Sequence, residues 1–214
     1  MRAAREGDGA PRRPLRRVLS KSLPRFVFES VMIVFSILLA LGVSQCSEQA
    51  SRRERAQVAL RNIHAEITTN AASLRRSVPY HRDMVKRLDA LLADSAAVLR
   101  REGMVGTLGR IAPEGLQPPT LSSTAWEMAT MTDAVARTDY SRLYAISRLY
   151  QLQRMGVEGT LPRLSELIFS PDAFRTEQDP LPSLRLLQLI LNELLTQEEY
   201  LLERYGEVLR ANAG

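Results

Sequence analysis

Residues able to carry out chemistry are few in this chain of 214 residues, which has two histidines and one cysteine. His64 stands two residues from Glu66 on a predicted helix, and residues at that spacing do not share a face, so they cannot bind one metal ion together. Cys46 lacks the neighbouring base that a thiol nucleophile requires. The stretch GMVGTLG lacks the Lys-Ser/Thr ending of a phosphate-binding loop. We therefore predict a protein that is not an enzyme and holds no metal ion or cofactor.

Three polar residues are more informative, because each falls within a segment predicted to form a helix. If Asn70 and Gln153 face the core, they would pair with each other or with Glu66. Buried polar pairs of this kind fix the register of packed helices. We prefer this structural role over ligand binding, which stays the alternative.

The one tryptophan, Trp126, stands at the start of a short predicted helix beside Met128 and Met131. A single large aromatic side chain at such a place most often fills a core. The alternative is that Trp126 lines a pocket beneath a loop predicted over residues 103–121, with hydroxyl groups supplied by Tyr140 and Tyr144.

The segments that must position these side chains are predicted to be helical. Apolar or small residues recur every three or four positions from Ala56 to Leu99, which predicts a long amphipathic helix over residues 45–102. Pro79 interrupts the pattern and predicts either a kink or two helices in sequence. Four glycines and three prolines then predict a loop over residues 103–121.

Residues 122–214 are predicted to form the rest of a helical domain. Ser122 or Ser123 and Thr138 or Asp139 are expected to begin two helices, and Asp179-Pro180 begins the longest one. That last helix carries a seam of apolar residues in three- and four-residue steps, in which Glu198 is the one polar exception: Leu184, Leu187, Leu191, Leu194, Leu201, Tyr205 and Val208. The fold class predicted is all-α, an N-terminal transmembrane helix followed by an antiparallel helical bundle with long first and last helices.

The transmembrane helix is predicted over residues 26–44. These 19 residues contain a single ionisable side chain, Glu29. As a helix they would be about 28 Å long, close to the hydrocarbon thickness of about 30 Å in a bilayer. A cleaved signal peptide is the alternative, but both the leader and the apolar run are long for one.

Charge predicts the orientation of this helix. Residues 1–25 form a basic tail with eight Lys or Arg against two acidic side chains, whereas four arginines follow the apolar segment within about twenty residues. We therefore expect a single span in a bacterial cytoplasmic (inner) membrane, with a cytoplasmic N-terminus and an extracytoplasmic C-terminal domain. The rest of the chain is nearly neutral, which excludes the basic face of a nucleic-acid-binding protein.

Small residues recur every fourth position within the apolar segment, at Ser36, Ala40 and Ser44. This spacing allows two helix backbones to approach closely. The lipid bilayer is the partner expected for this segment, and self-association into a homo-oligomer through the small residues is an open alternative to their ordinary frequency in membrane spans.

Two stretches resemble the signatures of an uncharacterised family of bacterial single-span membrane proteins, a domain of unknown function. They are RFVFESVMIVFSILLALGVSQCSEQASRRERAQVALRNIHAEITTN and TAWEMATMTDAVARTDYSRLYAISRLYQLQ. The family commonly has a tryptophan just beyond the span, where this chain has Cys46. The resemblance implies placement and fold but no activity. The residues matched are Glu29, Ala40, Glu48, Leu60, Ile63, Glu66, Ile67, Asn70, Trp126, Tyr140, Tyr150 and Gln153.

Together these features predict a non-catalytic, membrane-anchored interaction or scaffold module that binds an unidentified envelope protein. The alternative is an extracytoplasmic small-molecule sensor that signals through contacts within an oligomer. An enzyme would require a pocket in which His64 or His81 meets a distant carboxylate.

Overall fold

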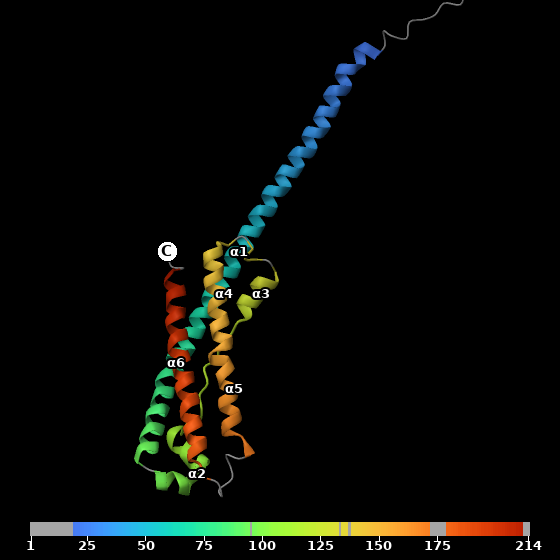
Figure 1. Cartoon of the computed structure of the whole chain (residues 1–214). Helices are drawn as coiled ribbons and strands as arrows, with labels where there is room; N and C mark the ends of the chain where they lie inside the picture. Colours follow the sequence, from blue (N-terminus) through green and yellow to red (C-terminus); the bar gives the residue numbers. More distant parts are fainter. Residues whose placement is uncertain (1–18, 95, 133, 137, 172–178, 212–214) are drawn as a thin grey trace, which may run out of the picture. The chain divides into compact units, whose positions relative to one another are not determined.

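The computed structural model describes residues 19–94, 96–132, 134–136, 138–171 and 179–211, and all regular structure in these ranges is helical (Figure 1). The first and last helices are the longest, which confirms the predicted all-α class with long terminal helices. Most of the predicted basic tail, residues 1–18, lies outside the described residues. The helices are α1 (Leu19–Asp94), α2 (Ala96–Ile111), α3 (Thr124–Met131), α4 (Tyr140–Met155), α5 (Val157–Ile168) and α6 (Leu181–Ala211).

The chain divides into two compact units, Met1–Arg52 and Arg53–Gly214, and α1 contributes to both. In the first unit the large apolar side chains from Phe26 to Val43 are 47–67% exposed. Their most apolar window has a mean hydropathy of 2.4 and none of it is buried within the chain. By length and composition, α1 is the one described helix able to cross a membrane.

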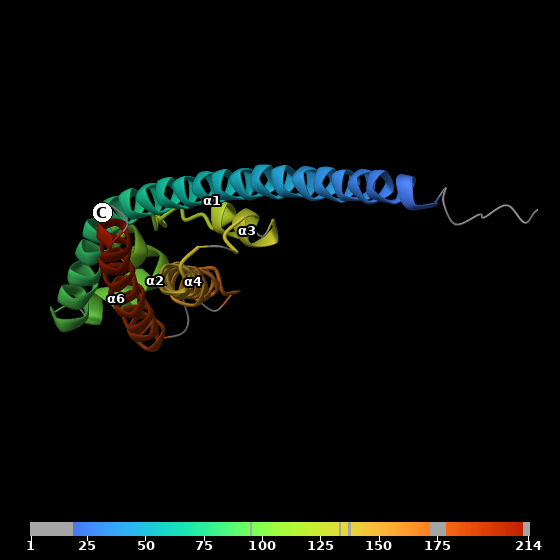
Figure 2. The same ribbon diagram turned by 90° about the horizontal axis from the view of Figure 1, so that it is seen from above.

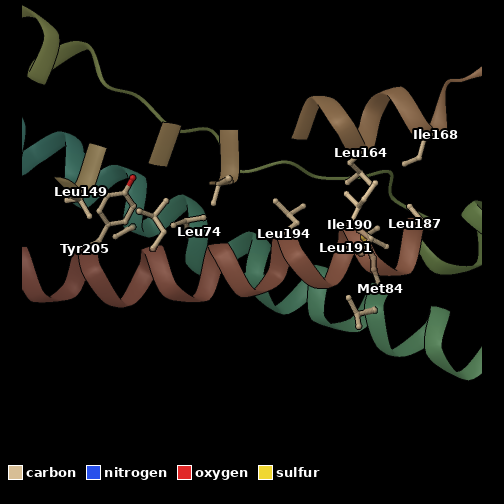
Figure 3. Close-up of a cluster of buried hydrophobic side chains, with 14 of the residues drawn as sticks. Leu74, Met84, Leu149, Leu164, Ile168, Leu187, Ile190, Leu191, Leu194 and Tyr205 are labelled. Carbon is tan, nitrogen blue, oxygen red and sulfur yellow. The ribbon is translucent and has the colours of Figure 1, made fainter. Parts of the chain in front are cut away.

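The second unit has a continuous apolar core in which α6 is central. The leucines predicted as the seam of the last helix are buried, and Val208 packs at the edge of the core. Figure 3 shows Leu187 and Leu191 of α6 close to Leu164 and Ile168 of α5, with Met84 of α1 nearby. The stripe predicted on the first helix is buried from Ile63 to Leu88, so its three- and four-residue spacing was read correctly.

Pro79 does not divide the first helix into two, because α1 continues through it to Asp94. The helix bends where its colour passes from teal to green (Figure 2). Proline removes one helical hydrogen bond, yet Val78 and Met84 are buried on either side of it. Packing against the rest of the unit therefore keeps the helix continuous.

The loop predicted over residues 103–121 is wrong in its first part. Helix α2 runs to Ile111 and departs from helical geometry only at Gly103, whose φ is 69°. It continues because Met104, Thr107 and Ile111 are buried on one side, and because the Thr107 hydroxyl donates to the carbonyl of Gly103 at 2.8 Å. The non-helical segment is residues 112–123, called the connector below.

Local signals at helix ends were more reliable. Asp139 caps α4, accepting a hydrogen bond from the amide of Arg142 at 3.1 Å. Gly156 ends the same helix, and a Cβ there would lie 2.7 Å from the carbonyl oxygen of Leu152. Asp179 accepts from the amide of Leu181 at the start of α6. These are the residue types expected at helix ends.

Candidate functional site

The connector crosses the second unit without regular structure, and side chains of α1 bind its backbone. The hydroxyl of Ser73 accepts from the amide of Thr120 at 2.9 Å, and that of Ser77 donates to the carbonyl of Gln117 at 3.2 Å. Tyr80 donates to the carbonyl of Gly115 at 2.7 Å. Backbone N–H and C=O groups outside helices and strands need other hydrogen-bond partners. Here Ser73, Ser77 and Tyr80, which we call the polar stripe of α1, supply them.

Two connector residues have positive φ, Gly115 at 81° and Gln117 at 45°. Glycine adopts this region freely, whereas a glutamine does so at an energetic cost. Gln117 is held there by two hydrogen bonds. The Ser77 hydroxyl donates to its backbone carbonyl, and its side-chain amide donates to the Glu114 carboxylate at 2.6 Å. The stripe therefore fixes the shape of the connector as well as its place.

Asn70 is the polar residue of α1 that binds the far end of the connector. Its amide donates to the carbonyl of Ser122 at 2.7 Å, and its side-chain oxygen accepts from the Ser122 amide at 3.0 Å. It also lies 3.3 Å from the side-chain oxygen of Gln153 on α4. Asn70 and Gln153 are both 1% exposed, so the structure brings together the two residues expected to meet in the core.

The side chain of Gln153 links α4 to three other helices, α1, α5 and α6. Its side-chain oxygen accepts from the hydroxyl of Tyr205 on α6, and its amide donates to Glu158 on α5 at 2.7 Å. Burial, the largest effect, raises the pKa of Tyr205 far above the ordinary value, so the hydroxyl stays protonated and remains a donor. We call Glu66, Asn70, Ser122, Tyr150, Gln153 and Tyr205 the polar cluster.

Glu66 forms the other side of the polar cluster, and it caps a helix to which it does not belong. Its carboxylate accepts from the amide of Ala125 at 2.9 Å and from the hydroxyl of Ser122 at 2.7 Å. Ser123, at the N-cap of α3, makes no capping bond with its own side chain. A carboxylate is favoured at a helix N-terminus, where amides lack partners. Glu66 thus supplies the cap of α3 from α1.

Tyr150 donates its hydroxyl to Glu66 at 2.7 Å. Burial, and then the hydrogen bond and charge of Glu66, raise the pKa of this phenol well above its ordinary value. Its ring stacks on Trp126, with centroids 5.7 Å apart and planes within 10°. Trp126 is therefore packed against the core, as the preferred interpretation expected.

Tyr140 and Tyr144 do not join Trp126 around a pocket. They are 79% and 55% exposed and stack on each other, with centroids 6.3 Å apart. Tyr140 opens α4 ten residues before Tyr150, a rise of about 15 Å along the helix. These positions do not support the alternative interpretation, in which the three aromatic residues line one pocket.

A buried charge pair lies further along α1, where His81 meets Glu198 of α6. The side chains are 2% and 0% exposed. The imidazole Nδ1 lies 2.8 and 3.0 Å from the two carboxylate oxygens, and Nε2 lies 2.7 Å from the carbonyl of Leu116. Because a carbonyl only accepts, Nε2 must carry a proton, and a second proton is shared between Nδ1 and the carboxylate.

Burial alone would lower the pKa of His81, and this is the largest single effect. The hydrogen bond and charge of Glu198, with the Leu116 carbonyl, outweigh it, so the pKa is raised above the ordinary 6.5. Glu198 stood out in the sequence as the one polar exception in an apolar seam, but nothing local showed that it pairs with His81. A histidine and a distant carboxylate do converge, yet the pair is closed to solvent and joins α1, α6 and the connector.

A groove of about 890 Å³ opens between α1 and α3. We call it the α1–α3 groove. Exposed Val58 and Met128 are among its lining residues, as is Glu66 of the polar cluster. Most of the remaining lining side chains are small or polar: Glu54, Arg55, Ala59, Asn62, Thr124, Ala125, Ala129, Thr132 and Ala134.

The other predicted positions lie on α1 in the first unit. Ser36, Ala40 and Ser44 are exposed, and the Ser36 hydroxyl bonds the carbonyl of Met32 within the same helix at 2.8 Å. Cys46 is exposed and unpaired. In the ranges that the structure covers, no three His, Cys, Asp or Glu side chains gather in a way that would hold a metal ion.

Comparisons of this chain with protein-family models, with curated proteins and with solved structures gave no match. The resemblance to a family of single-span membrane proteins therefore stays a prediction that two stretches of sequence carry.

Proposed function

We propose that this protein is a membrane-tethered interaction module, in which residues 26–44 span a bacterial inner membrane and an extracytoplasmic helical bundle binds other envelope proteins. The observation that carries the proposal is the apolar segment of α1. Its large side chains are 47–67% exposed around the whole helix, so the chain itself offers them no core. Lipid is the environment that would cover such a surface.

An antiparallel bundle is the arrangement we propose for the long helices of the second unit. Three side-chain contacts support it: Asn70 with Tyr205, Arg82 with Glu199, and Asp89 with Gln188. Residue numbers rise along α1 as they fall along α6. Such a bundle would present rigid helical faces outside the membrane.

Binding is favoured over catalysis by the way the polar residues are used. The polar cluster bonds helix ends and the connector, and His81 and Glu198 bond each other. A catalytic group would need an unused donor or acceptor within reach of a substrate. The interaction role also gives a purpose to the tether, since confinement at the membrane raises the effective concentration of the bundle near its partners.

A topology test decides the placement. Alkaline phosphatase and green fluorescent protein, fused separately after Gly214, report an oxidising outer compartment and the cytoplasm respectively. We expect an active phosphatase, a dark fluorescent fusion and full-length chain in the membrane pellet after alkaline extraction. A fluorescent fusion would reverse the proposed orientation, and a full-length chain in the soluble fraction would overturn the tether.

A further inference from the structure

The surface that carries the strongest inference is the α1–α3 groove with the helical segment that borders it. Val58 is 40% exposed and Met128 is 55% exposed, so two apolar side chains that line the groove meet solvent. Its lining includes Ala59, Ala125 and Ala129, whose short side chains would let another helix backbone approach closely. The groove therefore leaves room for the backbone of another helix.

The charges at the end of the groove identify that helix. Glu54 and Arg55 are exposed, and neither forms an ion pair or hydrogen bond with any residue in the described part of the chain. At 100° per residue, Val58 falls between them on the helix, about 40° from Glu54 and about 60° from Arg55. An acidic and a basic side chain thus flank a line of contact through Val58.

A second copy of the same segment is complementary to this pattern. When two parallel helices are related by a two-fold axis, the residue on one flank faces the residue on the opposite flank of the partner. Glu54 of one copy would then lie opposite Arg55 of the other, and the reverse pair would form by symmetry. Two apolar Val58 side chains would meet between these charge pairs.

We propose that the chain forms a parallel homodimer in which residues 54–62 of each copy lie in the α1–α3 groove of the other. Val58 of one copy packs between Val58 and Met128 of its neighbour, over the alanines of the groove. The proposal rests on the membrane tether, because two copies inserted in one direction hold their α1 helices parallel. The binding partner of the proposed interaction module is then a second copy of the same chain.

Cysteine cross-linking of the full chain in native membrane vesicles tests the dimer. In a Cys46→Ser background, the Val58→Cys variant should form a disulfide-linked dimer on mild oxidation. The Gln57→Cys variant is the matched control, because Gln57 directly precedes Val58 in α1 and is exposed but does not line the groove. We expect several-fold more dimer from Val58→Cys than from Gln57→Cys.

Charge exchange then tests the complementarity. Adding Glu54→Arg to the Val58→Cys variant should lower the yield of dimer several-fold, since two arginines would face each other in place of each ion pair. Adding Arg55→Glu as well should restore the yield, because both pairs re-form with reversed signs. Loss of folding would not be repaired by a second charge change.

Equal cross-linking at positions 57 and 58 in the membrane would overturn the dimer, and so would cross-links only to a different protein. Failure of the double charge exchange to restore the yield would do the same. A full-length chain found in the soluble fraction would instead overturn the membrane tether on which the dimer rests.

Discussion

The two parts of α1 have the same backbone structure and opposite side-chain patterns. From Phe26 to Val43 apolar side chains surround the helix and are exposed. From Ile63 to Leu88 they form one stripe, which is buried, while the other faces are polar. A helix satisfies most of its backbone hydrogen bonds internally in either case, so its side chains decide which surroundings it needs.

This difference teaches that a helix assignment alone says little about placement. The stripe shows where a neighbouring helix must lie, whereas apolar residues on all sides show that no single neighbour would be enough. The following changes test this contrast, from the largest expected effect to the smallest.

Two arginines in the apolar segment should have the largest effect. In the Ile37→Arg, Leu41→Arg double variant each arginine costs about 2.5–3.5 kcal/mol at the centre of a membrane-spanning helix. We expect the chain to leave the membrane pellet after alkaline extraction. Gln57→Arg, on an exposed face of the second unit, should leave fractionation unchanged. Retention of the double variant in the pellet would contradict a lipid environment for this segment.

Breaking the buried charge pair should destabilise the bundle strongly. Glu198→Ala leaves His81 buried without its carboxylate, which costs about 3–5 kcal/mol of unfolding free energy. Urea unfolding of the full chain in mild detergent measures it. Glu199→Ala is the matched control, since Glu199 pairs with Arg82 on the surface and should lose at most about 1 kcal/mol. Equal losses in the two variants would argue against a closed pair.

Removing the amide of Asn70 should have a somewhat smaller effect. Asn70→Leu leaves the amide and carbonyl of Ser122 without their α1 partner, and we expect a loss of about 2–3 kcal/mol. The same unfolding assay measures it. Asn192→Leu, on an exposed face of α6, should change the stability by less than about 0.5 kcal/mol. A stable Asn70→Leu variant would mean that the connector is held without Asn70.

The His81 pair should also make the stability depend on pH. Since the pKa of His81 is higher in the folded chain than its ordinary 6.5, its contribution is fully present below pH 6.5. It is lost as the pH rises through the folded value. The difference in unfolding free energy between wild type and His81→Gln should therefore shrink from pH 6 to higher pH. Parallel pH curves for the two proteins would contradict the protonated imidazole.

The smallest effect is expected at a local helix end. Asp139→Ala removes the cap of α4 and should cost about 1 kcal/mol. Asp139→Ser keeps a capping oxygen and should recover most of that loss in the same assay. If serine and alanine behaved alike, the hydrogen bond to the Arg142 amide would carry no stability.

The helices of the second unit were predictable where one segment contains the signal. The stripe on α1, the seam on α6 and the ends at Asp139 and Gly156 follow from spacing and residue type within a few turns. The prediction for residues 103–111 was wrong because glycines usually favour a loop. Burial of Met104 and Ile111 overrides that preference in α2.

The contacts of the candidate site could be predicted only in part. Asn70 and Gln153 were expected to meet because both are polar residues on predicted core helices. The cap that Glu66 gives to α3 was beyond prediction, since Glu66 and Ala125 are 59 residues apart. His81 and Glu198 are separated by 117 residues, and their pairing depends on how far α6 is shifted along α1.

The sequence by itself determined two things about this protein: an apolar segment long enough for a bilayer, and amphipathic helices with one buried face. Both depend on periodicity and hydropathy, which are properties of neighbouring residues. Only the tertiary structure decided which polar residues share the core and how the connector is held. Those choices depend on the register between helices, where a shift of one turn, about 5.4 Å, would separate every pair.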